Sequence, residues 1–456
     1  MFQHVLCVYP YQVGLKSFKF CPPLGIEYIG TVVEPYTRAL DIIDLRKESA
    51  VTMDFLRPET DMVCFSINWK RELEFLHSEI RSVPPNILTI LGGHQVTDDP
   101  ESWFAALPSV DIIVRGEGEE IMEELCRGVP LENIAGLSFR RGDDIIHNSS
   151  RRLRPLSDYL YPNRNLRHYS YELEISGFKT GVEFDMLSAS RGCPFNCTFC
   201  SFNRNPWGQK RNWSGRSPES VVQELALIKA PFVAFADELF TYDMDWVDRI
   251  CDLIMARGIR KKYIVNARLE IARRPDVIRK MEQAGFAILM LGVESAQDKT
   301  LRSMRKGFNT AKIREYFEVL RERSIILHGY FILGNIGESV SEMEQIVPFA
   351  RELGLDTLNL CMLHTLPHSG IEDLVAQNPN YHIAPNSKVY SDHCSIKELK
   401  RLRDNLFKKF YTRRQMLHIM DKATRNGFFK LFPQLLIKLP QFASSFQKLF
   451  VANALK

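Results

Sequence analysis

Short apolar runs alternate with amphipathic stretches along the first 130 residues. Five runs are rich in β-branched and other apolar residues, as expected of parallel strands buried on both faces. They are Val5–Val8, Ala39–Leu45, Met62–Ile67, Ile87–Leu91 and Ile112–Val114. Helical periodicity lies between them, at Arg71–Ser82 and Glu119–Cys126 among others. The alternation predicts an α/β domain over residues 1–130 with a doubly wound parallel sheet, whose ligands bind outside the carboxyl ends of the strands.

A second alternation of strands and helices extends from Phe184 to Leu363. Its predicted strands are Phe184–Ser188, Phe232–Ala236, Tyr263–Ala267, Ala287–Leu291, Ile325–Leu333 and Thr357–Met362. Its predicted helices are Ser217–Lys229, Asp243–Ala256, Arg274–Ala284, Thr310–Arg323 and Ser341–Leu353. Six strands cannot close an eight-stranded barrel, so an open (β/α)6 partial TIM barrel is expected over residues 181–370.

The remaining segments are a connector and a tail. Residues 131–180 have a looser pattern and are expected to connect the two domains, with a hairpin over Leu137–Ile146. Residues 371–456 are expected to form a helical, basic C-terminal region, with one helix from Ile396 to Met420. From Ile396 to Lys456 there are fourteen Lys and Arg residues against three Asp and Glu residues.

Composition places the chain among ordinary globular proteins. Of 456 residues, 45% are apolar and 25% are charged. No apolar run approaches the length of about 18 residues that a membrane-spanning helix needs, and no secretory leader is visible. Seven of the ten cysteines are scattered among apolar runs, as reduced buried thiols would be. We therefore expect a cytoplasmic protein.

The other three cysteines lie within eight residues. Cys193, Cys197 and Cys200 occur in the stretch RGCPFNCTFC, a spacing expected by chance in roughly 0.005 of such chains. Four-iron clusters normally take four protein thiolates, so a loop with three leaves one iron open for another ligand. The alternative is a zinc site, which would need a fourth ligand in tetrahedral geometry. The nearest candidates, His168 and Cys251, form no local pair of the zinc-finger kind.

This loop resembles the CxxxCxxC signature of the radical S-adenosylmethionine (SAM) superfamily, including the aromatic Phe199 before the last cysteine. The resemblance implies a partial-barrel fold and a [4Fe–4S] cluster held by Cys193, Cys197 and Cys200. It further implies that SAM binds the open iron and is cleaved by one-electron reduction to methionine and a 5′-deoxyadenosyl radical. An electron donor such as flavodoxin or ferredoxin is then expected as a partner.

The later strands of the predicted barrel end in groups that suit SAM. Arg268 could pair with the methionine carboxylate, and Glu294 could accept from the ribose hydroxyls or the amino group. Surface ion pairs are the alternative for both residues. The glycine-rich fifth strand would let adenine lie against backbone. The predicted SAM-binding residues are Phe199, Asp237, Glu238, Asn266, Arg268, Glu294, Ser295 and Gly334. No catalytic residue is assigned.

The first domain resembles the cobalamin-binding domain that precedes many radical SAM enzymes, through the stretches Cys21–Gly30, Gly92–Thr97, Pro100–Glu101 and Asp111–Glu119. The resemblance implies that the glycines let the backbone approach the nucleotide tail of the corrin, while the loop Ser66–Lys70 lies beneath the ring. The predicted cobalamin-binding residues are Tyr11, Ser66, Asn68, Trp69, Gly92, Gly93, His94, Gln95, Thr97, Gly116, Glu117 and Gly118.

The residue beneath the cobalt is predicted to be Trp69 or Asn68, with Trp69 as a plain core residue the alternative. The Asp-x-His-x-x-Gly motif of mutase-type cobalamin domains is absent from this sequence. His94 is therefore not assigned as a cobalt ligand.

Together the resemblances imply a cobalamin-dependent radical SAM enzyme that methylates an unactivated carbon of a small molecule. In such an enzyme cobalamin delivers the methyl group and a second SAM replaces it. Three alternatives stay open. They are an oxidative cyclase or ring-rearrangement enzyme, a radical SAM enzyme whose vestigial cobalamin domain serves only docking, and a non-catalytic iron–sulfur or corrinoid-binding protein.

The basic tail has two interpretations. It could dock at the membrane periphery on anionic lipid, or help to admit a lipophilic substrate. The alternative is a basic helix packed over the barrel. No groove-reading motif accompanies the basic residues, so no nucleic acid partner is expected. The sequence does not specify the substrate or the oligomeric state.

Overall fold

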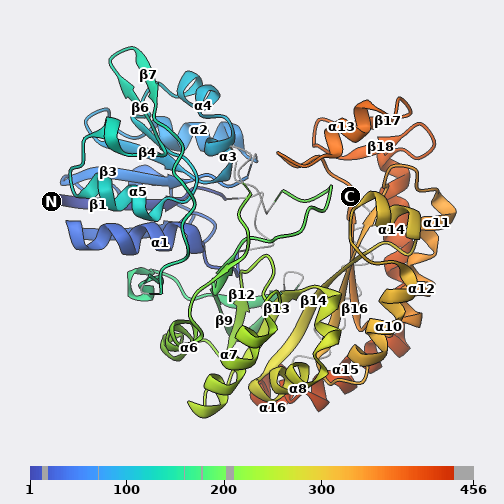
Figure 1. The fold of residues 1–456 in the computed structure, drawn as a ribbon. Coiled ribbons are helices and arrows are strands. Elements are labelled where there is room, and N and C mark those ends of the chain that lie inside the picture. The colour runs from blue at the N-terminus through green and yellow to red at the C-terminus, as the bar shows by residue number, and fades with distance from the viewer. Residues whose placement is uncertain (13–18, 70, 159, 176–177, 202–209, 436–456) are drawn as a thin grey trace. The chain divides into compact units, whose positions relative to one another are not determined.

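The computed structural model describes residues 1–12, 19–69, 71–158, 160–175, 178–201 and 210–435 (Figure 1). The chain forms two compact α/β units. The first contains Met1–Tyr171, and the second contains Glu172–Arg204 and the chain from Lys210 onward. The predicted loop residue Lys70 and residues 436–456 of the predicted tail lie outside the described residues. The same is true of 159, 176 and 177 in the predicted connector.

The first unit is built on a seven-stranded sheet of order β2-β1-β3-β4-β5-β6-β7. Its strands are β1 Phe2–Tyr9, β2 Thr37–Asp44, β3 Thr60–Ser66, β4 Leu88–Gly92, β5 Ile112–Val114, β6 Leu137–Arg141 and β7 Asp144–His147. The first five strands run parallel, and β6 and β7 continue the sheet antiparallel from β5. The predicted parallel sheet is confirmed, because the apolar runs are buried as strands covered on both faces.

Five α-helices accompany this sheet. They are α1 Leu24–Val33, α2 Leu73–Arg81, α3 His94–Asp98, α4 Pro100–Ala106 and α5 Glu119–Cys126. The stretch Gly92–Thr97 begins at the end of β4 and continues into α3, which begins at His94. Gly93 makes this possible, because its φ of 103° turns the chain sharply between β4 and α3.

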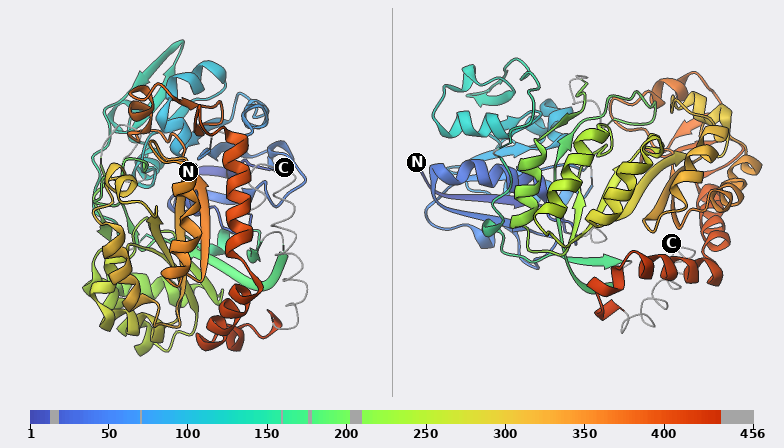
Figure 2. Two further views of the ribbon diagram at one scale, coloured as in Figure 1. Left: turned by 90° about the vertical axis from the view of Figure 1, so that its right-hand side faces the viewer. Right: turned by 60° about the horizontal axis from the view of Figure 1, so that its bottom comes forward.

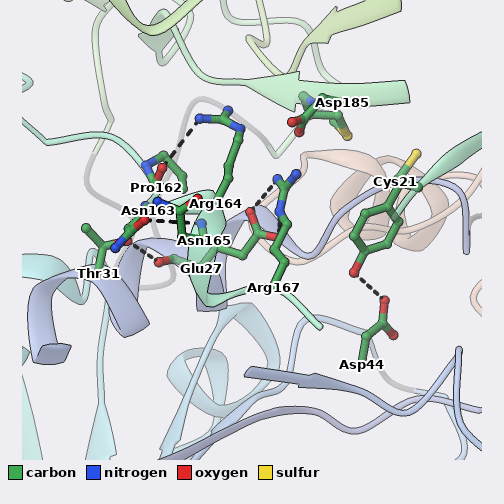
Figure 3. A network of polar contacts seen from close by, with 12 residues as sticks. Cys21, Glu27, Thr31, Asp44, Pro162, Asn163, Arg164, Asn165, Arg167 and Asp185 are labelled. Atoms are coloured by element: carbon green, nitrogen blue, oxygen red, sulfur yellow. Dashed lines mark hydrogen bonds and ion pairs between the residues drawn. The ribbon is translucent and has the colours of Figure 1, made fainter. Parts of the chain in front are cut away.

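Residues 131–171, expected to be part of a connector, are integrated into the first unit. The hairpin β6–β7 extends its sheet, and a later segment is fastened to α1 (Figure 3). Arg167 donates from Nε and Nη2 to both oxygens of the buried Glu27, each over 2.7 Å. The Asn163 amide donates to the Thr31 hydroxyl over 2.8 Å. Paired charges of this kind are how a buried carboxylate is tolerated.

The second unit contains a seven-stranded sheet of order β16-β15-β14-β13-β12-β9-β8. Its strands are β8 Glu172–Ile175, β9 Phe178–Leu187, β12 Phe232–Phe235, β13 Lys262–Ala267, β14 Phe286–Glu294, β15 Ile326–Leu333 and β16 Thr357–Met362. The last six run parallel, and β8 pairs antiparallel with β9. The predicted six-stranded open barrel is confirmed.

Helices between these strands lie along the outer face of the curved sheet (Figure 1). They are α6 Pro218–Leu227, α7 Met244–Ala256, α8 Pro275–Ala284, α9 Asp298–Ser303, α10 Thr310–Leu320, α11 Val340–Glu344 and α12 Ile346–Glu352. Ser217 caps α6, because its side chain accepts from the Ser220 amide. Two small antiparallel pairs accompany the barrel, β10 Ser190–Arg191 with β11 Ser214–Gly215, and β17 Tyr381–Ile383 with β18 Val389–Ser391.

The described part of the tail contains two main helices where one was predicted. After α13 Ile371–Ala376, the chain forms α14 Ile396–Phe410, α15 Arg413–Arg425 and the short α16 Phe428–Leu431. The prediction of one continuous helix from Ile396 to Met420 is wrong, because Thr412 has an extended backbone and caps α15. Figure 2 shows the C-terminal helices, in red, as separate segments. No helix in the described part of the chain is long and apolar enough to cross a membrane.

Candidate functional site

The three clustered cysteines lie in the second unit, on the loop between β10 and β11, and all three are partly exposed. Backbone hydrogen bonds fix the loop. The Cys193 amide donates to the Arg211 carbonyl over 3.3 Å, and the Thr198 amide donates to the Met304 carbonyl over 3.2 Å. Within the loop, the Cys200 amide donates to the Cys197 carbonyl over 3.1 Å. The loop is therefore held in place while its thiols stay accessible.

The donor set fits an iron–sulfur cluster better than a single metal ion. No group of three or more His, Cys, Asp or Glu side chains among the residues that the structure describes is arranged around one ion. A cluster needs no such convergence, because each thiolate binds a different iron. Arg268 adds a favourable charge, since its Nη1 lies 3.9 Å from the sulfur of Cys197.

Asp237 and Glu238, two of the predicted SAM-binding residues, are hydrogen-bonded to the chain that leads into the cysteine loop. Asp237 is fully buried and accepts from the Ala189 amide over 2.9 Å and the Ser190 hydroxyl over 2.6 Å. Burial raises the pKa of Asp237 to about 7. Glu238 accepts from the Gly192 amide over 2.9 Å. Both carboxylates therefore orient the entrance of the loop.

Asn266 and Arg268 follow at the end of β13. The Asn266 side chain donates to the Asp237 carbonyl over 2.9 Å, which ties β13 to the same support. The Arg268 guanidinium stacks over the ring of Phe195, 3.7 Å from its centroid. It also pairs with Glu270 over 2.9 Å. Arg268 thus lies against the cysteine loop, and any pairing with a substrate carboxylate would compete with Glu270.

Glu294 and Ser295 end β14, and both are buried. Oε1 of Glu294 accepts from Nζ of Lys306 over 3.0 Å. The Ser295 hydroxyl donates to Glu338 over 3.2 Å, and burial raises the pKa of Glu338 to about 7. The Ser295 hydroxyl is therefore already hydrogen-bonded to a side chain of the second unit.

The other two predicted SAM residues are apolar contacts. Phe199 packs against a small buried cluster that includes Met304 and Leu363. Gly334 has a φ of 78°, and a Cβ there would lie 3.2 Å from Cδ1 of Leu399 on α14. The positive φ and the Leu399 side chain on α14 both explain why a glycine occupies position 334.

Lys306, Phe308 and Glu338 were missed by the sequence analysis although they lie beside the predicted residues. Lys306 and Phe308 follow α9, away from any strand end, so no strand pattern marked them. Glu338 was within the glycine-rich stretch after β15 but carried no expected role.

The predicted cobalamin-binding residues come together at the carboxyl edge of the first sheet. The Tyr11 hydroxyl is central to this edge. It accepts from the amides of Asn68 and Trp69 over 2.9 and 2.7 Å and donates to the Trp69 carbonyl over 3.0 Å. Burial raises the pKa of Tyr11 above its ordinary value, so it remains a neutral phenol. Tyr11 itself is wholly buried and holds the loop after β3 in shape.

In the loop after β3, the side chain of Trp69 is exposed, whereas that of Asn68 is hydrogen-bonded within the first unit. The Asn68 side chain donates to the Ser66 hydroxyl over 3.0 Å and accepts from the His94 amide over 3.4 Å. The side chain of Trp69 is exposed, at 48% of its full area. The alternative that Trp69 is a plain core residue is therefore wrong.

Gly92 to Thr97 form the next part of this edge. A Cβ on Gly93 would lie 2.5 Å from the Ile67 carbonyl oxygen, so only glycine fits there. The Gln95 amide donates to the same carbonyl over 3.1 Å, and the Thr97 hydroxyl donates to the Gly93 carbonyl over 2.7 Å.

The loop after β5 completes the edge. The Gly116 amide donates to the Thr97 hydroxyl over 3.3 Å, and Gly116 has a φ of 86° with open space where a Cβ would lie. Gly118 is a packing glycine, because a Cβ there would lie 2.9 Å from Ile29. Glu117 lies between them and is partly exposed. An open backbone edge beside an exposed aromatic side chain fits a large planar cofactor.

The profiles of two known families match the chain, one in each unit. The sequence profile of the radical SAM superfamily matches residues 187–375, which include the cysteine loop and the barrel strands from β12 to β16. The chain belongs to the radical SAM superfamily. The B12 binding domain profile matches residues 13–126. The protein is thus a radical SAM enzyme with a B12-binding domain, and its cofactors are a [4Fe–4S] cluster, SAM and cobalamin.

Several curated proteins resemble this radical SAM enzyme. An uncharacterized methyltransferase of Pyrococcus horikoshii is 25% identical over 431 residues, which cover 89% of this chain and 91% of that protein. The anaerobic magnesium-protoporphyrin IX monomethyl ester cyclase of Cereibacter sphaeroides is 30% identical, with 62% of this chain and 48% of the cyclase covered. The hopanoid C-3 methylase of Methylococcus capsulatus is 28% identical, with 70% and 63% covered. The chain therefore spans less than two thirds of the cyclase and the C-3 methylase.

A solved structure has the same fold. The cobalamin-dependent SAM radical enzyme OxsB, with aqua-cobalamin and SAM bound, superposes with a TM-score of 0.68 at 15% identity. The match covers 93% of this chain and 71% of OxsB.

Proposed function

We propose that this enzyme is a cobalamin-dependent radical SAM methyltransferase that adds a methyl group to an unactivated carbon of a small molecule. The observation that carries the proposal is the presence, in one chain, of a braced three-cysteine loop and an open glycine-rich sheet edge with an exposed tryptophan. When bound, the cluster and SAM supply a 5′-deoxyadenosyl radical that removes a substrate hydrogen, and cobalamin supplies the methyl group, which a second SAM replaces.

The chain's own residues would hold these groups. Cys193, Cys197 and Cys200 would ligate the cluster, while Asp237 and Glu238 orient their loop. Glu294 would accept from SAM, because it is the carboxylate at the end of β14 with an oxygen to spare. Phe199 would lie against SAM from the cysteine loop. Arg268 would shield the negative charge of the cluster, given its contact with Cys197.

We further propose that Trp69, rather than Asn68, lies beneath the cobalt. Asn68 already uses its side-chain amide within the first unit, whereas the Trp69 ring is exposed. The glycines at 93 and 116 would allow the backbone to approach the nucleotide tail. His94 contributes its amide nitrogen to the Asn68 contact, and no role for its imidazole is proposed.

We also propose a substrate class from the concave face of the barrel. Along most of β13 to β16, buried side chains alternate with a second set that is half-buried, or exposed at Cys361. His328 and Tyr330 belong to this second set. Burial lowers the pKa of His328 to about 4 and raises that of Tyr330 to about 12, so both are neutral at physiological pH. A surface of this kind favours an uncharged, lipophilic substrate.

The experiment uses SAM with a deuterated methyl group. The holoenzyme, reduced and kept anaerobic, is incubated with cobalamin and with lipid extract of the source cells, and mass spectrometry follows the label. A methyltransferase should move the CD3 group into the corrinoid pool and then into a product. Cleavage of SAM to 5′-deoxyadenosine with no CD3 transfer would contradict methylation and favour a cyclase, the activity named for the relative at 30% identity.

Two partners are also proposed. A small redox protein such as flavodoxin or ferredoxin would reduce the cluster. The tail would contact an anionic membrane surface, because α15 exposes Leu417, at 71% of its full area, beside the exposed Arg413 and Arg414. Co-sedimentation with phosphatidylglycerol vesicles should be lost in Leu417→Asp if this contact exists. Equal sedimentation of the variant would contradict it.

A further inference from the structure

Lys306 is a buried lysine in the second unit that no motif marked. Only 4% of its surface is exposed. Its ammonium lies 3.0 Å from Oε1 of Glu294, and 5.5 and 5.9 Å from the ring centroids of Phe308 and Phe199. Among the described residues, the second oxygen of Glu294 has no hydrogen-bond donor. A buried cation is thus paired with one oxygen of a carboxylate whose other oxygen is open.

The backbone is shaped around this pair. Glu294 has a φ of 70°, which is uncommon for a residue with a side chain. The residues flanking Lys306 are also in the left-handed region, with φ of 55° at Arg305 and 80° at Gly307. A Cβ on Gly292 would lie 2.5 Å from Oε1 of Glu294 and 3.1 Å from Nζ of Lys306. Strained residues that cluster in this way mark functional sites more often than ordinary surfaces.

The same segment braces the cysteine loop. The Lys306 carbonyl accepts from Nη2 of Arg268 over 2.6 Å, and the guanidinium of Arg268 covers the Phe195 ring. The Thr198 hydroxyl donates to the Ser303 carbonyl over 3.2 Å, next to the backbone bond from Thr198 to Met304. The segment from Ser303 to Phe308 therefore joins the cluster loop to the carboxylate at the end of β14.

Stability alone explains this pair poorly. A buried ion pair is often no better than apolar residues of the same volume, because desolvation offsets the attraction between the charges. The buried pair of Lys306 and Glu294 at the end of β14 is better explained by a ligand that binds one of the two charged groups.

We propose that Lys306 is a positioning residue for SAM, whose ammonium holds the Glu294 carboxylate with its second oxygen toward the SAM ribose or amino group. The inference rests on the proposed role of Glu294. Through its carbonyl bond to Arg268, Lys306 also keeps that carboxylate in register with the cluster loop.

The test measures SAM affinity of the reconstituted holoenzyme by equilibrium dialysis with labelled SAM. Lys306→Met should weaken SAM binding by about tenfold or more at pH 7, as expected when a charged hydrogen-bonding group is misplaced. Lys306→Arg, which keeps the charge, should stay within about threefold of the wild type. Unchanged SAM affinity in a Lys306→Met protein with a full iron content would overturn the proposal.

The double variant Glu294→Gln/Lys306→Met keeps the proposal testable should Lys306→Met fail to assemble its cluster. It buries no lone charge, so it should fold, and its loss of SAM affinity should equal that of Glu294→Gln alone. If the double variant instead lost the summed affinity losses of the two single variants, Lys306 would not act through Glu294 and the proposal would be overturned. Wild-type affinity in Glu294→Gln would remove the proposed role of Glu294 itself, whereas a wild type that cleaves no SAM would remove the proposed function.

Discussion

The amide nitrogen of Gly192 donates to Oε2 of Glu238 over 2.9 Å, which joins the residue before Cys193 to the end of β12. Gly192 has a φ of 91°, and a Cβ there would lie 2.5 Å from the Asn212 carbonyl oxygen. The cysteine loop therefore begins at a backbone position that is fixed by a carboxylate and open only to glycine. The geometry of the cluster ligands depends on this support.

Removing the Glu238 carboxylate should loosen the loop. Glu238→Ala leaves the Gly192 amide without its acceptor, so we expect lower iron retention after anaerobic reconstitution and about tenfold slower SAM cleavage. Iron analysis and chromatography of 5′-deoxyadenosine check this. The exposed Glu318→Ala provides a matched control. Iron content and cleavage equal to the control would show that Glu238 does not support the loop.

Asp237 should make stability depend on pH. Its pKa is about 7 in the folded protein and 3.8 in the unfolded chain, so the folded state binds the proton more tightly. The contribution of Asp237 to the free energy of unfolding is therefore complete below pH 4, and it is lost as the pH rises to about 7. Relative to the wild type, Asp237→Asn should therefore gain about 3–4 kcal/mol in unfolding free energy between pH 4 and pH 8.

Denaturant midpoints of the two proteins across this pH range measure the difference. Asn at position 237 can accept from the Ala189 amide and donate to the Ser190 hydroxyl, so the variant preserves the local geometry. Asp373→Asn, at an exposed position, should show no such trend. A constant difference between Asp237→Asn and the wild type would mean that the carboxyl is already ionised at pH 5.

Tyr11 should control cobalamin affinity without touching the solvent. Tyr11→Phe leaves the amides of Asn68 and Trp69 without an acceptor, which frees the loop that presents Trp69. We expect about tenfold weaker binding of hydroxocobalamin, measured by equilibrium dialysis. Tyr242→Phe, at an exposed tyrosine of the second unit, serves as the control. If Tyr11→Phe and Tyr242→Phe bound hydroxocobalamin equally well, the loop after β3 would not be part of the cobalamin site.

The tail should be fastened to the barrel by one buried ion pair. Lys422 on α15 lies 2.7 Å from Oδ2 of Asp356, which also accepts from the Leu327 amide over 2.7 Å. Lys422→Met removes the buried cation beside Asp356, which keeps a hydrogen bond from His418 over 2.8 Å, and should cost up to about 3–5 kcal/mol of unfolding free energy. Urea denaturation of the second unit, with the exposed Lys430→Met as control, measures this. If Lys422→Met lost no more unfolding free energy than Lys430→Met, α15 would be held by other contacts.

The sequence predicted the elements and the strand ends well, because both rest on local patterns. Runs such as Met62–Ile67 and Phe232–Ala236 had to be buried strands, and the cysteine loop was visible as spacing alone. Contacts between distant segments were not visible. Nothing near Gly334 in the sequence reveals that Leu399 packs on it, 65 residues later.

The roles of individual site residues were harder to predict than their location. Asp237 was predicted to bind SAM from its place after a strand, and the hydrogen bonds of its side chain to Ala189 and Ser190 could not be predicted from that place. Lys306 lies in no strand-end pattern and reaches the site only because of the left-handed residues on each side of it. Side-chain partners depend on tertiary packing, which strand periodicity does not encode.

The central claim is tested most directly by SAM cleavage in the cysteine variants. The anaerobically reconstituted wild type should hold about four irons per chain and, with dithionite, form 5′-deoxyadenosine from SAM. Cys193→Ala, Cys197→Ala and Cys200→Ala should each abolish this cleavage, while Cys126→Ala, in the first unit, should leave it intact. Cleavage that persists in any of the three loop variants would contradict the assignment of these cysteines as the ligands of a SAM-cleaving cluster.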